Sequence, residues 1–136
     1  MQDRIINLHI SLLPWNRGFS PNIWSFIDDT PKGVTIHCVS EGLDEGDVLF
    51  QKEVEFDEKK ESFASSYEKL NAVLVELFKR NWKHIFDGSF LSYRKKQIGK
   101  GSSHSIADLK ELRQTIDFEW KENVNDFLLR YRTIGK

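Results

Sequence analysis

A chain of 136 residues is long enough for one domain, and its 39% hydrophobic content, with ten Phe and four Trp, can bury a substantial core. A formal net charge of −1 and no basic run longer than Arg94 to Lys96 argue against binding along a phosphate backbone. The single cysteine, Cys38, excludes an intrachain disulfide, and we expect it to be buried. Asp3 and Arg4 interrupt any signal peptide and no apolar run reaches about 18 residues, so we expect a cytoplasmic protein without a membrane span.

The first predicted element is a short buried strand from Arg4 to Ile10, which needs neighbouring strands on both sides. After a loop, Ser20 and Pro21 are expected to open a helix that ends near Asp29, because Ser is a good N-cap and Pro suits the first helical position. The remaining pattern predicts strands over 34–39 and 47–56, a long amphipathic helix over 58–86, an irregular segment over 89–104, and helices over 105–112 and 120–132. This order of elements predicts an α/β fold.

Two polar side chains, Asn7 and His9, share one face of the first predicted strand, because successive side chains of a strand alternate between faces. An amide can stabilise a developing oxyanion, and an imidazole can move a proton. An Asn and a His in a strand can equally be hydrogen-bonded core or edge residues. Spacing alone does not decide between these interpretations.

A second polar stretch, from Glu41 to Asp47, places several carboxylates around two glycines between two predicted strands. It is either a polar turn or the source of a carboxylate that orients a nearby histidine, and spacing does not select which carboxylate. The stretch lacks the regular alternation of oxygen ligands found in calcium loops, and we expect no metal site.

Several other residues favour ordinary structural roles. His37 lies in a predicted strand and is expected to be structural, and Trp120 is expected to pack rather than to form a binding platform. Arg17 could contact an anionic substrate or stabilise a turn, and the sequence does not separate the two.

The sequence resembles the formyltransferase catalytic domain from about Arg4 to about Gly88. The resemblance rests on Asn7-Leu8-His9-Ile10-Ser11-Leu12-Leu13-Pro14, Asn16-Arg17-Gly18, Pro21, Trp24, Gly33-Val34-Thr35-Ile36-His37 and Gly42-Leu43-Asp44-Glu45-Gly46-Asp47-Val48-Leu49. That family includes methionyl-tRNA formyltransferase, glycinamide ribonucleotide transformylase and the sugar-nucleotide N-formyltransferases.

The resemblance implies formyl transfer from 10-formyltetrahydrofolate, the formyl donor, to an amine. It implies that Asn7, His9 and Asp44 are the catalytic trio, in which Asn7 and a protonated His9 stabilise the oxyanion and Asp44 keeps His9 charged. It also implies that a segment of five residues lines the pterin pocket, largely through backbone groups. These residues are Val39, Ser40, Glu41, Gly42 and Leu43.

Two runs, Trp15 to Gly18 and Pro21 to Trp24, look most like the sugar-nucleotide branch, so the acceptor is expected to be a nucleotide-linked amino sugar. We expect no C-terminal β-barrel of the kind that tRNA-acting members carry, and the mild acidity of the chain argues against a tRNA partner. We expect the partners to be small molecules, with no membrane involved.

The resemblance further implies that residues 1–100 form the second half of a Rossmann-like formyltransferase domain whose N-terminal half is absent, followed by a helical tail over 101–136. The first strand would then present an unpaired edge, so we expect self-association or completion by the missing half. The alternative function is a catalytically incomplete remnant that acts as an assembly or partner-binding module.

Overall fold

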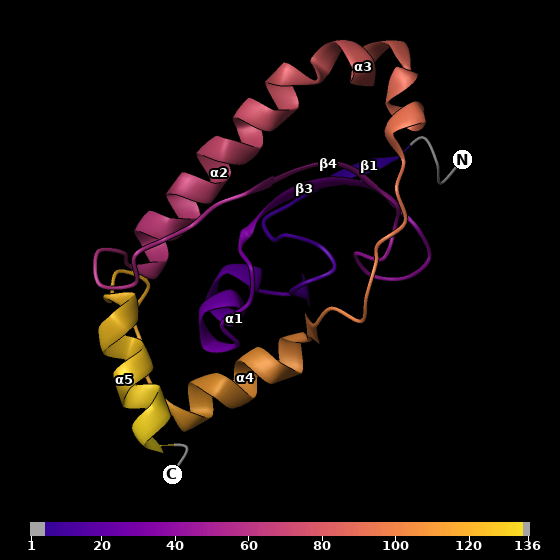
Figure 1. Ribbon diagram of the computed structural model, residues 1–136. Coiled ribbons are helices and arrows are strands. Elements are labelled where there is room, and N and C mark those ends of the chain that lie inside the picture. The colour runs from indigo at the N-terminus through magenta and orange to yellow at the C-terminus, as the bar shows by residue number, and fades with distance from the viewer. Residues whose placement is uncertain (1–4, 135–136) are drawn as a thin grey trace.

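The computed structural model describes residues 5–134 and is built around a small antiparallel sheet (Figure 1). Its strands are β1 (Ile6–His9), β3 (Gly33–Cys38) and β4 (Val48–Glu53), in the order β1-β3-β4. The register pairs Asn7 with His37 and His9 with Thr35, and it shifts at Ile36/His37. The central strand β3 is buried along its whole length, as its β-branched sequence leads one to expect.

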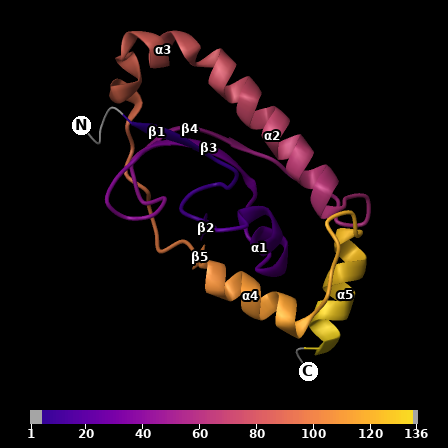
Figure 2. The same cartoon turned by 180° about the vertical axis from the view of Figure 1, so that it is seen from behind.

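The helices surround this sheet and the loops beside it (Figure 2). They are α1 (Pro21–Ile27), α2 (Phe63–Arg80), α3 (Trp82–Asp87), α4 (Ile106–Thr115) and α5 (Val124–Ile134), with a 3₁₀ helix η2 (Ser89–Tyr93) after α3. Two short strands, β2 (Arg17–Gly18) and β5 (Ser103–His104), pair in parallel. Within residues 5–134, none of the helices combines the length and the apolar character needed to cross a bilayer.

Two apolar clusters hold the fold together. One lies between α2 and the sheet and includes Val34, Ile36, Leu70 and Leu74. The other joins α1 and the start of α2 to α4 and α5, and its most buried members are Phe26, Phe63, Val124 and Phe127. Each fully buried side chain of this size contributes about 1.5–3 kcal/mol through removal of apolar surface from water. The C-terminal helices therefore share a core with α1.

The fold class agrees with the predicted α/β order, but several boundaries differ. The long predicted helix over 58–86 is in fact α2 and α3, separated at Asn81. It begins late because the Ser62 hydroxyl accepts a bond from the Ser65 N–H, which fixes the first turn at Phe63. It breaks at Asn81 because that side chain donates to the Leu77 carbonyl and the backbone leaves the helical conformation.

The other boundary errors have equally local causes. Ser20 adopts a left-handed conformation with φ 53° and makes no side-chain cap, so the predicted capping of α1 by Ser20 is wrong. α4 extends to Thr115, and α5 starts only at Val124, after a turn. β4 ends at Glu53, and the segment predicted to be irregular holds η2 and β5.

The first strand was expected to present an unpaired edge, and among residues 5–134 it does lie at an edge of the sheet, although it is less buried than predicted. β1 pairs only with β3, and it does so in antiparallel fashion. Its Asn7 and Leu8 side chains are exposed, whereas His9 is 8% exposed. Because β1 lies at an edge of the sheet, Asn7 stays accessible to a ligand.

Candidate functional site

The pairing of β1 with β3 brings Asn7 opposite His37 at the edge of the sheet. The Asn7 Nδ2 atom lies 3.3 Å from His37 Nε2. The other ring nitrogen, His37 Nδ1, lies 2.9 Å from the Cys38 carbonyl oxygen, to which only an N–H can donate. His37 Nε2 therefore accepts from the Asn7 amide when it carries no hydrogen, and donates to Asp44 Oδ1, 3.4 Å away, when it carries one.

Asp44 enters this cluster from the loop between β3 and β4. Its Oδ1 atom lies 3.4 Å from His37 Nε2, and its Oδ2 atom lies 3.7 Å from His9 Nδ1. Asp44 has φ 56° and is 8% exposed, so a left-handed turn points a carboxylate inward. The Gly18 N–H donates to Asp44 Oδ2 over 2.8 Å. The structure thus brings Asn7, His9 and Asp44 together, with His37 linking Asn7 to Asp44.

The second nitrogen of His9 is held by the loop after β1. His9 Nε2 lies 3.0 Å from the carbonyl oxygen of Asn16, which can only accept, so Nε2 carries the hydrogen. In the neutral ring the lone pair is then on Nδ1, on the side of Asp44. A proton taken up by His9 would arrive at this nitrogen and meet the carboxylate.

Burial lowers the pKa of the His9 imidazole below its ordinary value of 6.5, and the Asp44 carboxylate and the Asn16 carbonyl offset this only in part. Without a ligand, burial therefore favours the neutral imidazole, and the expectation that Asp44 supports a charged His9 during the reaction stays a prediction. Burial also opposes ionisation of Asp44, but the contacts with His37, His9 and the Gly18 N–H outweigh it, so the pKa of Asp44 lies below its usual value. At rest the pair is a neutral imidazole beside a carboxylate.

These two shifts predict that the protein loses stability in acid. Because the pKa of His9 is lowered in the folded state, the unfolded chain binds more protons as the pH falls below 6.5, and unfolding becomes easier until the folded pKa is reached. One proton limits this slope to about 1.4 kcal/mol per pH unit. Asp44 adds a second loss of stability at pH values below 3.8, the ordinary pKa of its carboxyl group. Urea unfolding between pH 7.5 and 5.5 should show the first decline, and His9→Gln should flatten it; equal slopes in both proteins would contradict the assignment.

Gly18, whose N–H donates to Asp44, lies very close to the backbone of His104. It has φ 95°, and a Cβ atom there would lie 2.2 Å from the His104 carbonyl oxygen. Gly18→Ala should lower the free energy of unfolding by about 1–2 kcal/mol for the left-handed conformation alone. The clash should lower it further. Thermal unfolding measures the effect. Gly99, at φ 92° with open space around it, is the matched control: Gly99→Ala should cost only the conformational part, and an equal loss in both variants would contradict the steric argument.

A cavity of about 330 Å³ opens beside His9. It is mostly apolar, with Ile10, Ile23, Tyr67 and Trp120 among its walls. The rings of Tyr67 and Trp120 meet edge to face with centroids 5.5 Å apart. Trp120 was expected only to pack, but it is 44% exposed and forms a wall of the cavity that contains His9.

Comparison with known proteins shows the family of the chain. The Formyl transferase family model matches residues 1–80, which is more than half of the chain. The chain belongs to the formyl transferase family. The dTDP-4-amino-4,6-dideoxyglucose formyltransferase of Mycobacterium tuberculosis is 32% identical over 131 residues, which are 96% of this chain and 54% of that protein. Methionyl-tRNA formyltransferase of Thermodesulfovibrio yellowstonii is 44% identical over 73 residues, covering 53% of this chain and 23% of its own.

Solved structures of formyl transferases show the same arrangement of the chain. The formyltransferase PseJ from Anoxybacillus kamchatkensis, in complex with a UDP-linked formamido sugar and tetrahydrofolate, matches with a TM-score of 0.78 and 38% identity. The match covers 88% of this chain and 62% of PseJ. A sugar N-formyltransferase structure from Mycobacterium tuberculosis matches with the same TM-score, 31% identity and 93% coverage of this chain, but 53% of its own. The chain spans about half the length of the curated relatives it matches.

The segment expected to line the pterin pocket lies beside Asp44 but outside the cavity at His9. The Val39 N–H donates to the Ile5 carbonyl, and the Ser40 hydroxyl to the Gly42 carbonyl, while Glu41 is exposed. Leu43 is 59% exposed and lines a neighbouring hollow of about 320 Å³ together with residues of β2 and β5. The pterin contact of this formyl transferase stays a prediction.

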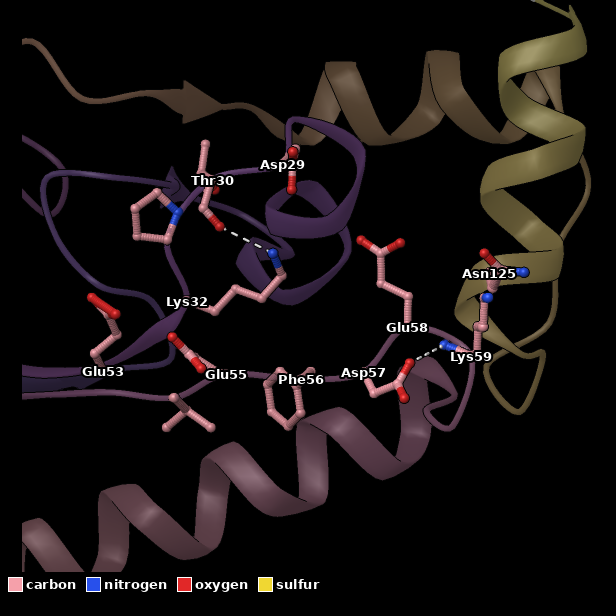
Figure 3. Close-up of a pocket in the computed structure, with 12 residues that line it drawn as sticks. Asp29, Thr30, Lys32, Glu53, Glu55, Phe56, Asp57, Glu58, Lys59 and Asn125 are labelled. Carbon is pink, nitrogen blue, oxygen red and sulfur yellow. Dashed lines mark hydrogen bonds between the residues drawn. The ribbon is translucent and has the colours of Figure 1, made fainter.

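A larger cavity, of about 500 Å³, lies elsewhere, between the end of α1 and the chain after β4 (Figure 3). Its walls carry the carboxylates of Asp29, Glu53, Glu55, Asp57 and Glu58. Lys32 donates to the Thr30 carbonyl there, and burial lowers the pKa of its ammonium group. A surplus of negative charge repels anions such as folates and nucleotides, so size does not make this cavity the substrate site of the formyl transferase.

His37 was expected to be structural, and its contacts with Asn7 and Asp44 were not predicted from the sequence. Its ring stands between Asn7 and Asp44 in the cluster. The signal that could have found it is the antiparallel register of β1 and β3, which puts Asn7 and His37 directly opposite each other. A single sequence does not reveal that register.

Proposed function

We propose that this chain carries the reaction centre for formyl transfer from 10-formyltetrahydrofolate to the amine of a nucleotide-linked amino sugar. The observation that supports it most is the cluster formed by two distant segments, in which Asp44 lies beside His9 and is joined to Asn7 through His37. Family membership supports the reaction type, and the sugar-nucleotide relatives support the class of acceptor.

The polar groups of Asn7 and His9 fit the charges that develop during this reaction. The bond from the formyl carbon to N10 of the folate breaks and a bond to the acceptor amine forms, while one proton moves from the amine to N10. Asn7 is exposed and has a second amide hydrogen beyond the one directed at His37, so it can donate to the formyl oxygen as negative charge develops. His9 Nδ1 can receive the amine proton, because Asp44 stabilises the imidazolium, and can then return it to N10.

The cavity beside His9 supports the choice of acceptor. Ligand pockets are mostly apolar with a few polar groups that fix orientation, and this cavity adds Ser20 and Asn22 to its apolar walls. We propose that the sugar ring of the acceptor lies against Trp120 and Tyr67, with its amine directed at His9.

A panel of acceptors tests the proposed function. Isotope-labelled 10-formyltetrahydrofolate is mixed with the protein and either a dTDP-linked amino sugar, a UDP-linked amino sugar, glycinamide ribonucleotide or methionyl-tRNA. We expect label in the formamide of an amino sugar nucleotide. Label only in methionyl-tRNA or in the glycinamide compound would contradict the acceptor class, and no transfer to any acceptor would contradict catalysis by the protein.

Trp120 should matter for acceptor binding and little for chemistry. Trp120→Ala removes one wall of the cavity, so we expect the KM for the acceptor to rise about tenfold, with kcat and the KM for the folate within about twofold. Trp82→Ala is the matched control, because Trp82 is similarly exposed at 49% but lies on α3. Equal effects of the two substitutions on acceptor KM would contradict the placement.

The exposed edge of the sheet favours a second candidate function, in which the chain is an assembly module. Among the described residues β1 has a strand neighbour on one side only, and Ile5 and Leu8 beside it are 52% and 38% exposed. An unpaired strand edge is a site for strand addition. Self-association of the chain through β1 would appear in light scattering as a multiple of 16.0 kDa, and a monomer at all concentrations would contradict it.

A further inference from the structure

Both groups at the centre of the proposed reaction are attached to one short loop, which runs from Leu13 to Phe19. The carbonyl of Asn16 accepts from His9 Nε2 over 3.0 Å. The N–H of Gly18 donates to Asp44 Oδ2 over 2.8 Å. The orientation of the imidazole and that of the carboxylate therefore depend on how this loop is held.

A segment from the other end of the chain crosses that loop. In Figure 1 the chain leaves α3, passes the loops between the strands as an extended stretch and reaches α4. Ser102 lies in this stretch and makes three hydrogen bonds to the loop. Its hydroxyl accepts from the Asn16 N–H over 2.9 Å, its carbonyl accepts from the Arg17 N–H over 2.8 Å, and its own N–H donates to the Pro14 carbonyl over 3.1 Å.

Gln97 joins the same loop to the loop that carries Asp44. Its Nε2 atom donates to the carbonyl oxygens of Asp44 and Gly46, over 2.7 and 2.8 Å. Its Oε1 atom accepts from the Nε and the Nη2 of Arg17, over 3.0 and 2.7 Å. A primary amide offers two donors and two acceptor sites, so the hydrogen-bonding capacity of Gln97 is fully used.

Polar contacts hold this segment in place. Ile98, beside Gln97, is 87% exposed, whereas Gln97 itself is half-buried. The amide of Gln97 has every bond made while Ile98 lies in water, so hydrogen bonds and not apolar burial attach this part of the segment. The segment also lies beyond residues 1–80, which the family model matches.

We propose that residues 97–104 form a clasp that fixes the geometry of the reaction centre, with Gln97 and Ser102 as positioning residues for Asp44 and His9. Ser102 acts on His9 through Asn16. Gln97 acts on Asp44 through its bond to the Asp44 backbone carbonyl and through its bonds to Arg17. The consequence for rate rests on the proposed function of His9 and Asp44; the consequence for their geometry does not. A small misplacement of a reacting group lowers the rate steeply while binding is conserved.

The test compares Gln97→Ala and Ser102→Ala with two matched controls outside the clasp, Gln114→Ala and Ser92→Ala, whose side chains are exposed. Ser102→Thr keeps the hydroxyl and should restore the wild-type values. Nitrogen-15 NMR of the imidazoles measures the His9 tautomer, and amide hydrogen exchange measures protection of the N–H groups of Asn16 and Gly18. Steady-state kinetics gives kcat and both KM values, and thermal unfolding gives the stability.

We expect Ser102→Ala to mix the two His9 tautomers and to raise Asn16 exchange about tenfold. We expect Gln97→Ala to raise Gly18 exchange by a similar factor. Each variant should lower kcat about tenfold, with both KM values within about twofold. Unchanged tautomer and exchange in both variants would overturn the clasp. If the NMR and exchange changes appear without any formyl transfer by the wild-type protein, the clasp stands and the proposed function fails. A fall in kcat that merely follows the unfolded fraction would overturn the positioning role.

Discussion

Replacing His9 by glutamine is expected to lower kcat for formyl transfer by about 10²- to 10⁴-fold, the usual loss when a positioned proton-transfer group is removed. Glutamine fills much of the same space and can donate to the Asn16 carbonyl, but it cannot take up a proton beside Asp44. The folate should still bind, since His9 contributes one wall of a cavity with many others. Steady-state kinetics with 10-formyltetrahydrofolate and an amino sugar nucleotide measures the loss.

His84 provides the matched control for this substitution. It lies on α3, where Nδ1 bonds to the Ser89 hydroxyl, and it takes no part in the cluster around Asp44. His84→Gln should leave kcat within about twofold of wild type. A His9→Gln protein that retains more than about a tenth of wild-type kcat would contradict the role of His9 in moving the proton.

The second large effect is expected from Asp44→Asn, which removes the charge and keeps an oxygen for the Gly18 N–H. Asp44 raises the pKa of His9 against the stronger effect of burial, so its loss lowers that pKa further. His9 then becomes a weaker base, and we expect kcat at pH 7.5 to fall about 10²-fold. The acidic limb of the profile of kcat/KM against pH should move to lower pH, because His9 stays neutral further into acid.

Asp47→Asn is the matched control, because it removes a negative charge from the same loop and so tests for a general effect of lost charge. Asp47 pairs with Arg94 at 2.9 Å on the surface, where such a contact contributes about 0–1 kcal/mol. Asp47→Asn should change kcat by less than about twofold and leave the acidic limb in place. A limb that stays fixed in Asp44→Asn, or moves to higher pH, would show that Asp44 does not support the charge on His9.

Parts of this site could be predicted from sequence because they depend on local rules. Alternation along a strand put Asn7 and His9 on one face, and both do lie at the Asp44 cluster. The resemblance selected Asp44 among several neighbouring carboxylates, a choice that spacing had left open. The long amphipathic pattern located α2 well, although Asn81 divides it from α3.

The rest depends on contacts between segments far apart in the chain. His37 joins the cluster only because β1 and β3 pair in antiparallel register, which no local pattern in either strand reveals. Gln97 and Ser102 lie in a stretch without periodicity, and their partners at Arg17, Asn16 and Asp44 are 53 to 86 residues away. The lowered pKa of His9 could not be predicted either, because burial, a property of the folded state, outweighs the nearby carboxylate.

The most direct test of the reaction centre is a crystal structure of the protein with 5-formyltetrahydrofolate and an amino sugar nucleotide. We expect the formyl oxygen about 3 Å from Asn7 Nδ2, with the acceptor amine beside His9 and the sugar against Trp120. A formyl group bound away from Asn7, His9 and Asp44, or an acceptor seated in the acidic cavity of Figure 3, would contradict the assignment.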